Sequence, residues 1–306
     1  MANDTSGLFQ TLVAAATMAS ENVKFRNAFL STIYWDYRPV EAAVGRSLEI
    51  NIPTVSEGDV TDIGSGDLQP TDTDHDNVTI TLDKHFSSSW IIKSWDQIRT
   101  PENLATKYLQ PRLEALKRKM NRSIAQLITT TNFATHTLIS GSGADVFDRA
   151  DIASAWQNLF DAGVPVDDTA NMAFVTNGTA YGKMLAATAF TSEAVVGVGA
   201  AEASLQRAVL FNQYGAQVIP DQHITAFNSG KQPGIFFHRH AIAGVTANPP
   251  SSGPGIDEMS MMVGDNVPVQ FQAQYNMLKQ GWVFNLRCFW GVKVVRAAYG
   301  SLLETA

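Results

Sequence analysis

A long polar arm of two strands that runs directly into a long helix is the feature that most constrains this chain. Ser47–Thr54 and Asn77–Ser94 show the alternation typical of strands, and the segment between them is rich in Gly, Ser, Thr and Asp. The apolar side chains of the two strands fall on one face: Ile50, Ile52, Val78, Ile80 and Leu82. Because so little apolar surface cannot form a core by itself, the arm has to be held by another surface, which in an assembly protein is that of the next subunit.

The loop at the tip of the arm, residues 55–76, is strongly acidic. No Lys or Arg occurs between Ser47 and Asp83, so no basic side chain within the arm neutralises the loop. Like charges repel one another and keep such a loop extended, unless a basic surface elsewhere receives it. The acidic side chains of the loop are Glu57, Asp59, Asp62, Asp67, Asp72, Asp74 and Asp76.

The arm leads into a helical pattern that begins at Thr100-Pro101-Glu102 and continues to about Thr130. Because a proline removes a backbone donor and disfavours helix at the preceding residue, Pro111 predicts a break. We therefore expect a short helix as far as Leu109 and a main helix from Pro111. The apolar stripe, at three- and four-residue steps, is Leu104, Tyr108, Leu109, Leu113, Leu116, Met120, Ile124, Leu127 and Ile128.

The same helix carries the most basic stretch of the chain, which includes Lys117. A solvated helix face is the simplest interpretation, and contact with DNA phosphates is a second. A third hypothesis is that these cations receive the acidic loop of a neighbouring subunit, because complementary charge fixes register at interfaces. The basic side of this hypothetical assembly interface is Arg112, Arg118, Lys119 and Arg122, and its acidic side is Glu57, Asp59, Asp62, Asp72, Asp74 and Asp76.

Beyond Thr131, strands and helices alternate, which predicts a mixed α/β domain. Gly215 is a suitable end for the helix that precedes it. The expected helices are Asp151–Phe160, Thr179–Ala187 and Ala200–Gln213, and the expected strands are Asn171–Thr176, Ala216–Ile219 and Gly234–His240. Asn248–Gly255 is a Pro- and Gly-rich boundary loop, and the last fifty residues are rich in strands. Their apolar faces are Val267, Val269, Phe271, Ala273 and Tyr275, then Trp282, Phe284, Leu286, Cys288, Trp290, Val292 and Val294.

Composition narrows the function classes. The 306 residues are 45% hydrophobic and 17% charged, which is an ordinary globular balance for one large domain or two connected ones. The net charge of −7 disfavours a dedicated nucleic-acid binder, although it suits a wall that encloses DNA without binding it tightly. The single cysteine, Cys288, excludes an internal disulfide and is expected to be buried. We find no signal peptide and no run of about 20 apolar residues, so we expect a protein of a reducing cytoplasm.

Two groups of side chains resemble metal sites, and each is incomplete. Asp72, Asp74 and Asp76 alternate as in an EF-hand loop, but Asn77 stands where that loop needs glycine, so a solvated acidic loop is expected. The pair His238 and His240 would share one face of a strand, but no third ligand is evident. The sequence therefore predicts no metal, no cofactor and no catalytic residue.

The order of these parts resembles the major capsid protein of tailed bacteriophages, with the Hong Kong phage type of capsid fold. The returning strand of that family's extended loop resembles Asn77–His85 and Trp90–Ser94, and its spine helix resembles Pro111–Ala125. Met172–Thr176, Gly178 and the helix through Met184 look like the start of its axial domain. Gly291–Arg296 resembles the closing strand. The resemblance covers nearly the whole chain.

The resemblance implies an α+β chain with five parts. These are the N-terminal arm (1–46), the extended loop (47–95), the peripheral domain with the spine helix (96–139), the axial domain (140–255), and the closing peripheral strands with the C-terminus (256–306). Two departures matter. Some members of the family link their subunits covalently through a lysine in the extended loop; this loop has no lysine between Arg46 and Lys84, so that link is not expected. Some members also carry a scaffolding segment of about a domain's length before the arm. Only 46 residues precede the loop here, which implies a separate scaffolding protein or none.

The function implied is that of a viral structural subunit in the virion. Many copies, as hexamers and pentamers, would self-assemble in the host cytoplasm into an icosahedral head around double-stranded phage DNA. The implied partners are further copies of the chain, a scaffolding protein, a portal, and weakly the packaged DNA, with no membrane. Two alternatives stay open. One is an encapsulin-like compartment shell, and the other is an acidic α/β enzyme or metal-binding module that uses His238 and His240.

Overall fold

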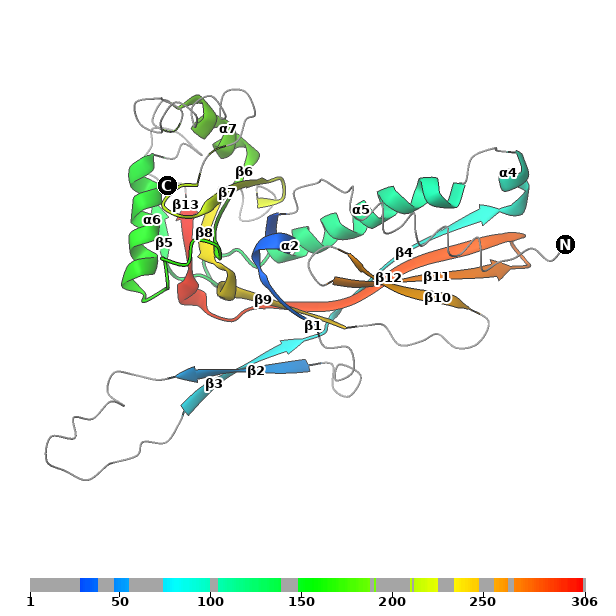
Figure 1. Cartoon of the computed structure of the whole chain (residues 1–306), viewed down its shortest axis with the longest axis horizontal. Coiled ribbons are helices and arrows are strands. Elements are labelled where there is room, and N and C mark those ends of the chain that lie inside the picture. Colours follow the sequence, from blue (N-terminus) through cyan, green and yellow to red (C-terminus); the bar gives the residue numbers. More distant parts are fainter. Residues whose placement is uncertain are drawn as a thin grey trace, which may run out of the picture.

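Two β-sheets, a long helix and a separate hairpin make up the computed structural model of the chain (Figure 1). The structure describes residues 28–37, 47–54, 74–99, 104–138, 148–187, 190, 210, 212–224, 234–247, 256–263 and 267–304. The expected N-terminal helical segment Leu8–Ala19, most of the acidic loop and the boundary loop Asn248–Gly255 lie outside these residues. The mixed α+β class predicted from the sequence is confirmed.

A six-stranded sheet forms the longer part of the molecule. Its order is β1-β9-β12-β11-β10, and β4 pairs with β12 along the edge opposite β11. The strands are β1 (Tyr34–Tyr37), β4 (Lys84–Lys93), β9 (Ile242–Ala247), β10 (Asp257–Val263), β11 (Val267–Asn276) and β12 (Gly281–Val294). The predicted apolar face of β12 is confirmed, because Phe284, Leu286 and Trp290 are buried. Cys288 is also buried, as expected.

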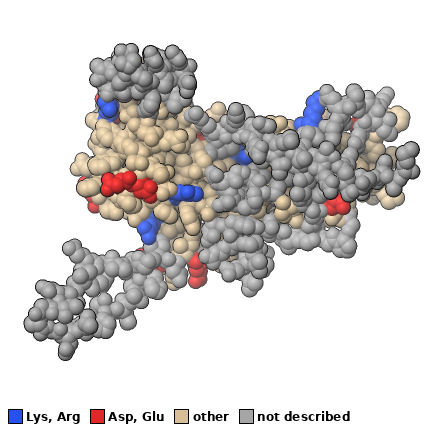
Figure 2. All heavy atoms as spheres, in the orientation of Figure 1, with Lys and Arg blue, Asp and Glu red and all other residues tan. Residues whose placement is uncertain are grey.

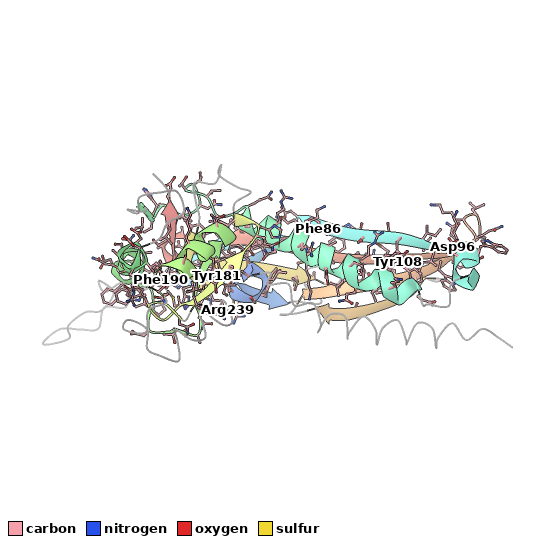
Figure 3. All side chains as sticks on the ribbon, turned by 90° about the horizontal axis from the view of Figure 1, so that it is seen from above. Phe86, Asp96, Tyr108, Tyr181, Phe190 and Arg239 are labelled. Carbon is pink, nitrogen blue, oxygen red and sulfur yellow. The ribbon has the colours of Figure 1, made fainter. Side chains whose placement is uncertain are left out.

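Helix α5 (Leu104–Ala125) lies along this sheet, after the short helix α4 (Ser94–Arg99), as Figure 3 shows from above. Most of the predicted stripe is buried, although Tyr108 is exposed. The predicted break at Pro111 is wrong, since α5 continues through it. The physical reason is that Leu109 and Leu113, on either side of the proline, are fully buried, and this packing outweighs one missing backbone hydrogen bond.

The arm is a hairpin of β2 (Ser47–Thr54) and β3 (Asp74–Thr81), which pair antiparallel. The predicted single strand Asn77–Ser94 is divided at Leu82–Asp83, where β3 ends and β4 begins. At the base of the arm, Ile80 is fully buried against Ala243 and Val245 of β9. The chain's own sheet therefore holds the base of the arm, whereas the sequence analysis expected the next subunit to hold the arm.

A five-stranded sheet forms the other part, in the order β5-β13-β8-β6-β7. Its strands are β5 (His136–Leu138), β6 (Met172–Asn177), β7 (Gln217–Asp221), β8 (Gly234–His238) and β13 (Gly300–Glu304). The predicted helix Asp151–Phe160 corresponds to α6 (Arg149–Asp161), and Thr179–Ala187 corresponds to α7 (Gly178–Ala186). Both expected helices are confirmed within one or two residues.

The end of the helix expected over Ala200–Gln213 is not helical, and the rest of that range (200–209 and 211) lies outside the described residues. Of its described residues, Leu210, Asn212 and Gln213 are not helical, and Gln213 instead bridges Ala216. Tyr214 and Gly215 form the tight turn between them, both with positive φ. Gly215 thus ends a hairpin turn and not a helix, because the two-residue turn needs left-handed backbone at both central positions.

The chain crosses between the two sheets at places that the sequence did not reveal. Strand β9 lies in the six-stranded sheet, although β8, which precedes it in the chain, lies in the five-stranded sheet. Strand β13 lies in the five-stranded sheet, although β12, which precedes it, lies in the six-stranded sheet. Helix α2 (Ala28–Thr32) and β1, expected in an N-terminal arm, are part of the core, since Phe29 is fully buried. Sheet membership depends on contacts between distant segments, which local patterns do not contain.

A buried polar network ties α2, α5 and β7 together. Asn121, fully buried on α5, donates from Nδ2 to Asp221 Oδ2 at 2.7 Å and accepts the backbone N–H of Phe29 at 3.1 Å. Asp221 also accepts the backbone N–H groups of Ala28, at 3.3 Å, and of His223, at 2.7 Å. The network fixes the start of α2 at the point where α5 meets the five-stranded sheet.

Candidate functional site

The basic residues of α5 divide into two groups. Arg112 and Lys119 face the strand β4 of their own chain. The guanidinium of Arg112 lies 5.6 Å from the ring centroid of Trp90 and donates to Ser89 O at 3.0 Å. Lys119 Nζ lies 4.8 Å from the ring centroid of Phe86, which Figure 3 labels beside the helix. These two cations therefore stabilise the packing of α5 on the sheet, at about 0.5–1 kcal/mol for each exposed cation–π contact.

Arg118 and Arg122 lie on a more exposed face of α5, four residues apart. Arg118 forms a long ion pair with Glu114, at 3.9 Å, and its side chain is about half exposed. This is the part of the predicted basic interface that is most accessible to another molecule. A surface ion pair of this kind contributes little to stability, on the order of 0–1 kcal/mol.

The acidic side of the predicted interface lies mostly outside the described residues. Glu57, Asp59, Asp62 and Asp72 are not described, and Asp74 and Asp76 stand at the start of β3. Figure 1 shows the β2–β3 hairpin on the side of the six-stranded sheet away from α5. The described part of the arm thus points away from the basic helix of its own chain. The pairing of acidic loop and basic helix between subunits stays a prediction.

The histidine pair does not share a strand face as expected. β8 ends at His238, which is buried, and His240 lies in the short 3₁₀ turn that follows and is exposed. Their rings are 5.2 Å apart, and the closest carboxylate oxygen to His238, on Asp168, is 3.6 Å from Nε2. Across the described ranges, no group of three or more His, Cys, Asp or Glu side chains could hold a metal ion.

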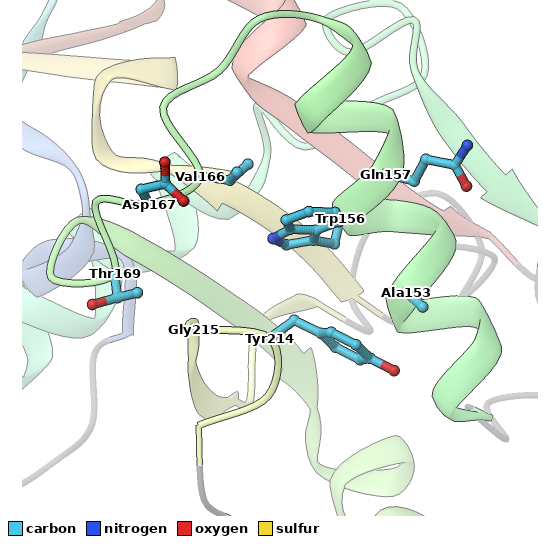
Figure 4. Close-up of a pocket in the computed structure, with 8 residues that line it drawn as sticks. All are labelled: Ala153, Trp156, Gln157, Val166, Asp167, Thr169, Tyr214 and Gly215. Atoms are coloured by element: carbon cyan, nitrogen blue, oxygen red, sulfur yellow. The ribbon is translucent and has the colours of Figure 1, made fainter.

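An open aromatic groove on the five-stranded part is the first surface that the sequence did not predict (Figure 4). It has a volume of about 610 Å³ and lies between α6 and the Tyr214–Gly215 turn. Trp156 on α6 forms one wall and stacks on Phe160, whose side chain is 58% exposed. Tyr214 forms the opposite wall. The residues that line the groove are Ala153, Trp156, Gln157, Val166, Asp167, Thr169, Tyr214 and Gly215.

An apolar tip at the end of the six-stranded sheet is the second such surface. The turn between β11 and β12 exposes Met277 by 81% and Leu278 by 97%. Trp95 on α4 and Tyr275 on β11 extend the apolar surface and border a groove of about 530 Å³. α4 is anchored to this turn, because Ser94 N donates to Gln280 O at 3.0 Å. Two apolar residues in a hairpin turn, where polar residues are usual, were the signal in the sequence.

Charged side chains are scattered on the face that Figure 2 shows. There, the charged side chains of the described residues occur in small groups, and neither sign forms a broad patch. None of the described helices is long and apolar enough to span a membrane. The two exposed apolar surfaces, at opposite ends of the molecule, are therefore the clearest candidates for contact with other molecules.

Comparison with known proteins gives similarity in structure only. No family model matches the chain, and no curated protein matches it in sequence. A solved structure from Mycobacterium phage Che8 is 17% identical, covers 90% of each chain and has a TM-score of 0.59. The capsid of cyanophage P-SCSP1u is 16% identical over 91% of this chain and 88% of that one, with a TM-score of 0.64.

Shells that are not phage capsids are also similar. The encapsulin SrpI complex of Synechococcus elongatus is 14% identical over 92% of this chain and 88% of that one, with a TM-score of 0.52. The phage structures are therefore somewhat closer in shape than the encapsulin. The long helix on the six-stranded sheet, the hairpin arm and the five-stranded sheet with its helices together have the Hong Kong phage type of capsid fold, as the sequence resemblance implied.

Proposed function

We propose that the chain is the major capsid protein of a bacteriophage, a structural subunit that self-assembles into an icosahedral head around double-stranded DNA. The observation that carries the proposal is the similarity of about nine-tenths of the chain to phage capsid structures. The assembled unit consists of hexamers and pentamers of the chain. A separate scaffolding protein and a portal complete the head, which is made in the host cytoplasm and becomes part of the virion.

The exposed surfaces support an assembly role. Leu278 and Met277 are held in solvent by the turn between β11 and β12 and are almost fully exposed. Burying a leucine side chain against a neighbour contributes about 1.5–3 kcal/mol. Repeated at every subunit of a closed shell, contacts of this size are sufficient to hold it together. We assign the apolar tip and the aromatic groove to contacts between subunits.

The charged residues of the arm and of α5 provide a further contact. The acidic loop of one subunit, with Glu57, Asp59, Asp62, Asp72, Asp74 and Asp76, meets the exposed basic face of a neighbouring α5. Arg118 and Arg122 are its main cations, while Arg112 and Lys119 also hold their own sheet. Because such a contact depends on charge, added salt weakens it. The Debye length is about 8–10 Å near physiological ionic strength and becomes shorter as salt is added.

The contents of the shell distinguish the proposed head from its closest alternative. An encapsulin-like compartment has the same fold and would enclose a protein cargo. The net charge of −7 suits a DNA container, because an acidic wall does not hold its contents tightly. Nucleic acid extracted from particles made in the native host supports the head, and an enclosed protein without DNA supports the compartment.

Expression of the chain, followed by size-exclusion chromatography and negative-stain electron microscopy, tests the proposal. We expect closed shells, sheets or ring-shaped capsomers. Leu278→Ser should raise the concentration needed for assembly roughly tenfold or more, since about 2 kcal/mol is lost per contact. Leu278→Met keeps the apolar area and is the matched control, which should assemble normally. A chain that stays monomeric even with a co-expressed scaffolding protein would contradict a shell function.

A further inference from the structure

Two short turns that lie against each other carry the chain between its sheets. One is η4 (Arg239–Ala241), between β8 and β9, and the other is η5 (Ala297–Tyr299), between β12 and β13. The backbone N–H groups of Val295 and Arg296 both donate to Ala241 O, at 2.9 and 3.3 Å. These hydrogen bonds join the two turns, and a buried core that includes residues of both sheets, such as Phe237 and Trp290, also joins the sheets. Figure 3 labels Arg239 in this boundary region.

His238 lies at the centre of this contact. Its residue is 1% exposed, and its Nδ1 accepts the backbone N–H of His240 at 3.3 Å. Because Nδ1 is an acceptor, the neutral ring carries its proton on Nε2. That Nε2 is 3.6 Å from Asp168 Oδ2, which is too long for a hydrogen bond, and it has no other partner among the described atoms. The imidazole is thus held in place as a neutral ring.

The groups that surround His238 are mainly basic or aromatic. From η5, the Tyr299 ring lies 5.7 Å from the His238 ring, and Arg296 donates to the Tyr299 hydroxyl at 2.8 Å. From η4, His240 lies 5.2 Å away and itself contacts Tyr34 of β1 at 5.3 Å. The titratable and charged groups at the junction are Tyr34, Asp168, His238, Arg239, His240, Arg296 and Tyr299. Asp168 is the single carboxylate of this set.

From this arrangement we infer that the junction is an acid-sensitive hinge, in which protonation of His238 separates the two turns. A proton from solvent adds to Nδ1, which can then no longer accept the N–H of His240. The new positive charge is buried close to Arg296 and His240, with one half-exposed carboxylate opposite. A buried charge without adequate compensation is unfavourable, so the ring moves toward water. The inference concerns the single subunit and is independent of the proposed function.

The direction of the pH dependence follows from the pKa values of the two histidines. Burial, followed by the charge of His240, lowers the pKa of His238 below its ordinary value. Burial, followed by Arg296 and Arg239, lowers the pKa of His240. The open junction then binds protons more readily than the closed one. The closed junction is fully stable above the ordinary histidine pKa of about 6.5. As the pH falls below that value, the equilibrium constant for opening rises by up to about tenfold per pH unit for each histidine.

Hydrogen exchange of backbone amides in the unassembled full chain tests the hinge. Exchange rates of residues 239–241 and 295–299, divided by their intrinsic rates, should rise about tenfold or more between about pH 7.5 and about pH 5. His238→Gln keeps an acceptor for the His240 N–H but does not titrate in this range, so it should abolish most of the rise. His136→Gln, at an exposed histidine of β5, is the matched control and should leave the rise unchanged.

A second variant keeps the test decisive if His238→Gln fails to fold. Asp168→Asn removes the one negative charge that favours protonated His238 in the closed junction. It should therefore increase the acid-induced opening while leaving exchange near pH 7.5 almost unchanged. The hinge is rejected if the normalised exchange of the wild-type junction does not change with pH, or if His238→Gln responds to acid as the wild type does.

Discussion

Asn121→Ala should be one of the most destabilising single substitutions on α5. Asn121 is fully buried and makes two hydrogen bonds, one to the Asp221 carboxylate at 2.7 Å and one from the Phe29 backbone N–H at 3.1 Å. Losing the bond to a charged partner costs about 1.5–3 kcal/mol, and leaving the Phe29 N–H buried without an acceptor costs about 1–3 kcal/mol. Because Asp221 keeps its bonds to the N–H groups of Ala28 and His223, we expect a total loss of about 3–5 kcal/mol.

Urea unfolding of the unassembled chain, followed by tryptophan fluorescence, measures this loss. Asn158→Ala is the matched control, because Asn158 is only half-buried and makes one hydrogen bond, to Thr137 Oγ1 at 2.9 Å. Its free energy of unfolding should fall by about 1 kcal/mol. The backbone amide of Phe29 should also lose exchange protection in Asn121→Ala and keep it in the control. Equal losses of stability in the two variants would refute a special role for the buried network.

Three further substitutions or measurements examine other parts of the fold. Gly291→Ala places a Cβ against the Thr81 carbonyl oxygen, so amide protection in β3 should fall, and an unchanged arm would contradict the close packing. Gly182→Ala, in open space on α7, should be neutral or slightly stabilising. Burial raises the pKa of Cys288 to about 12, so iodoacetamide near pH 8 should label the thiol only after unfolding, and rapid labelling of the native chain would show that the site opens. Pro111→Ala should stabilise the chain by about 1–3 kcal/mol by restoring a backbone hydrogen bond in a continuous α5, and a destabilised variant would mean that the proline has a role of its own.

Features with a local cause could be predicted from the sequence. The strand Ser47–Thr54 was placed with its correct bounds, because alternation of side chains is visible within eight residues. The apolar face of β12 was found for the same reason. The break at Pro111 was wrong, because the proline's local preference is weaker than the burial of the leucines on either side. The sequence analysis did not predict the strands β9 and β13, whose places in the sheets depend on strands far away in the chain.

The candidate site was harder to predict than the fold. The basic residues of α5 were identified by type, but the pattern could not show that Arg112 and Lys119 lie over Trp90 and Phe86 of another element. The aromatic groove brings α6 together with a turn nearly sixty residues later, so no local pattern contains it. The apolar tip could have been recognised, because apolar residues in a hairpin turn are unusual.

The three covalent connections between the sheets, from α5 to β5, from β8 to β9 and from β12 to β13, determine how the subunit responds to mechanical load. A force that pulls the two sheets apart is shared by three chain segments acting in parallel, and it must also extract the buried face of α5. A torque about the junction meets the backbone hydrogen bonds to Ala241 and also the buried core that the two sheets share, where Phe29 stacks on Phe237. The molecule should therefore resist both tension and torsion, so that a load applied to one sheet is transmitted to the other.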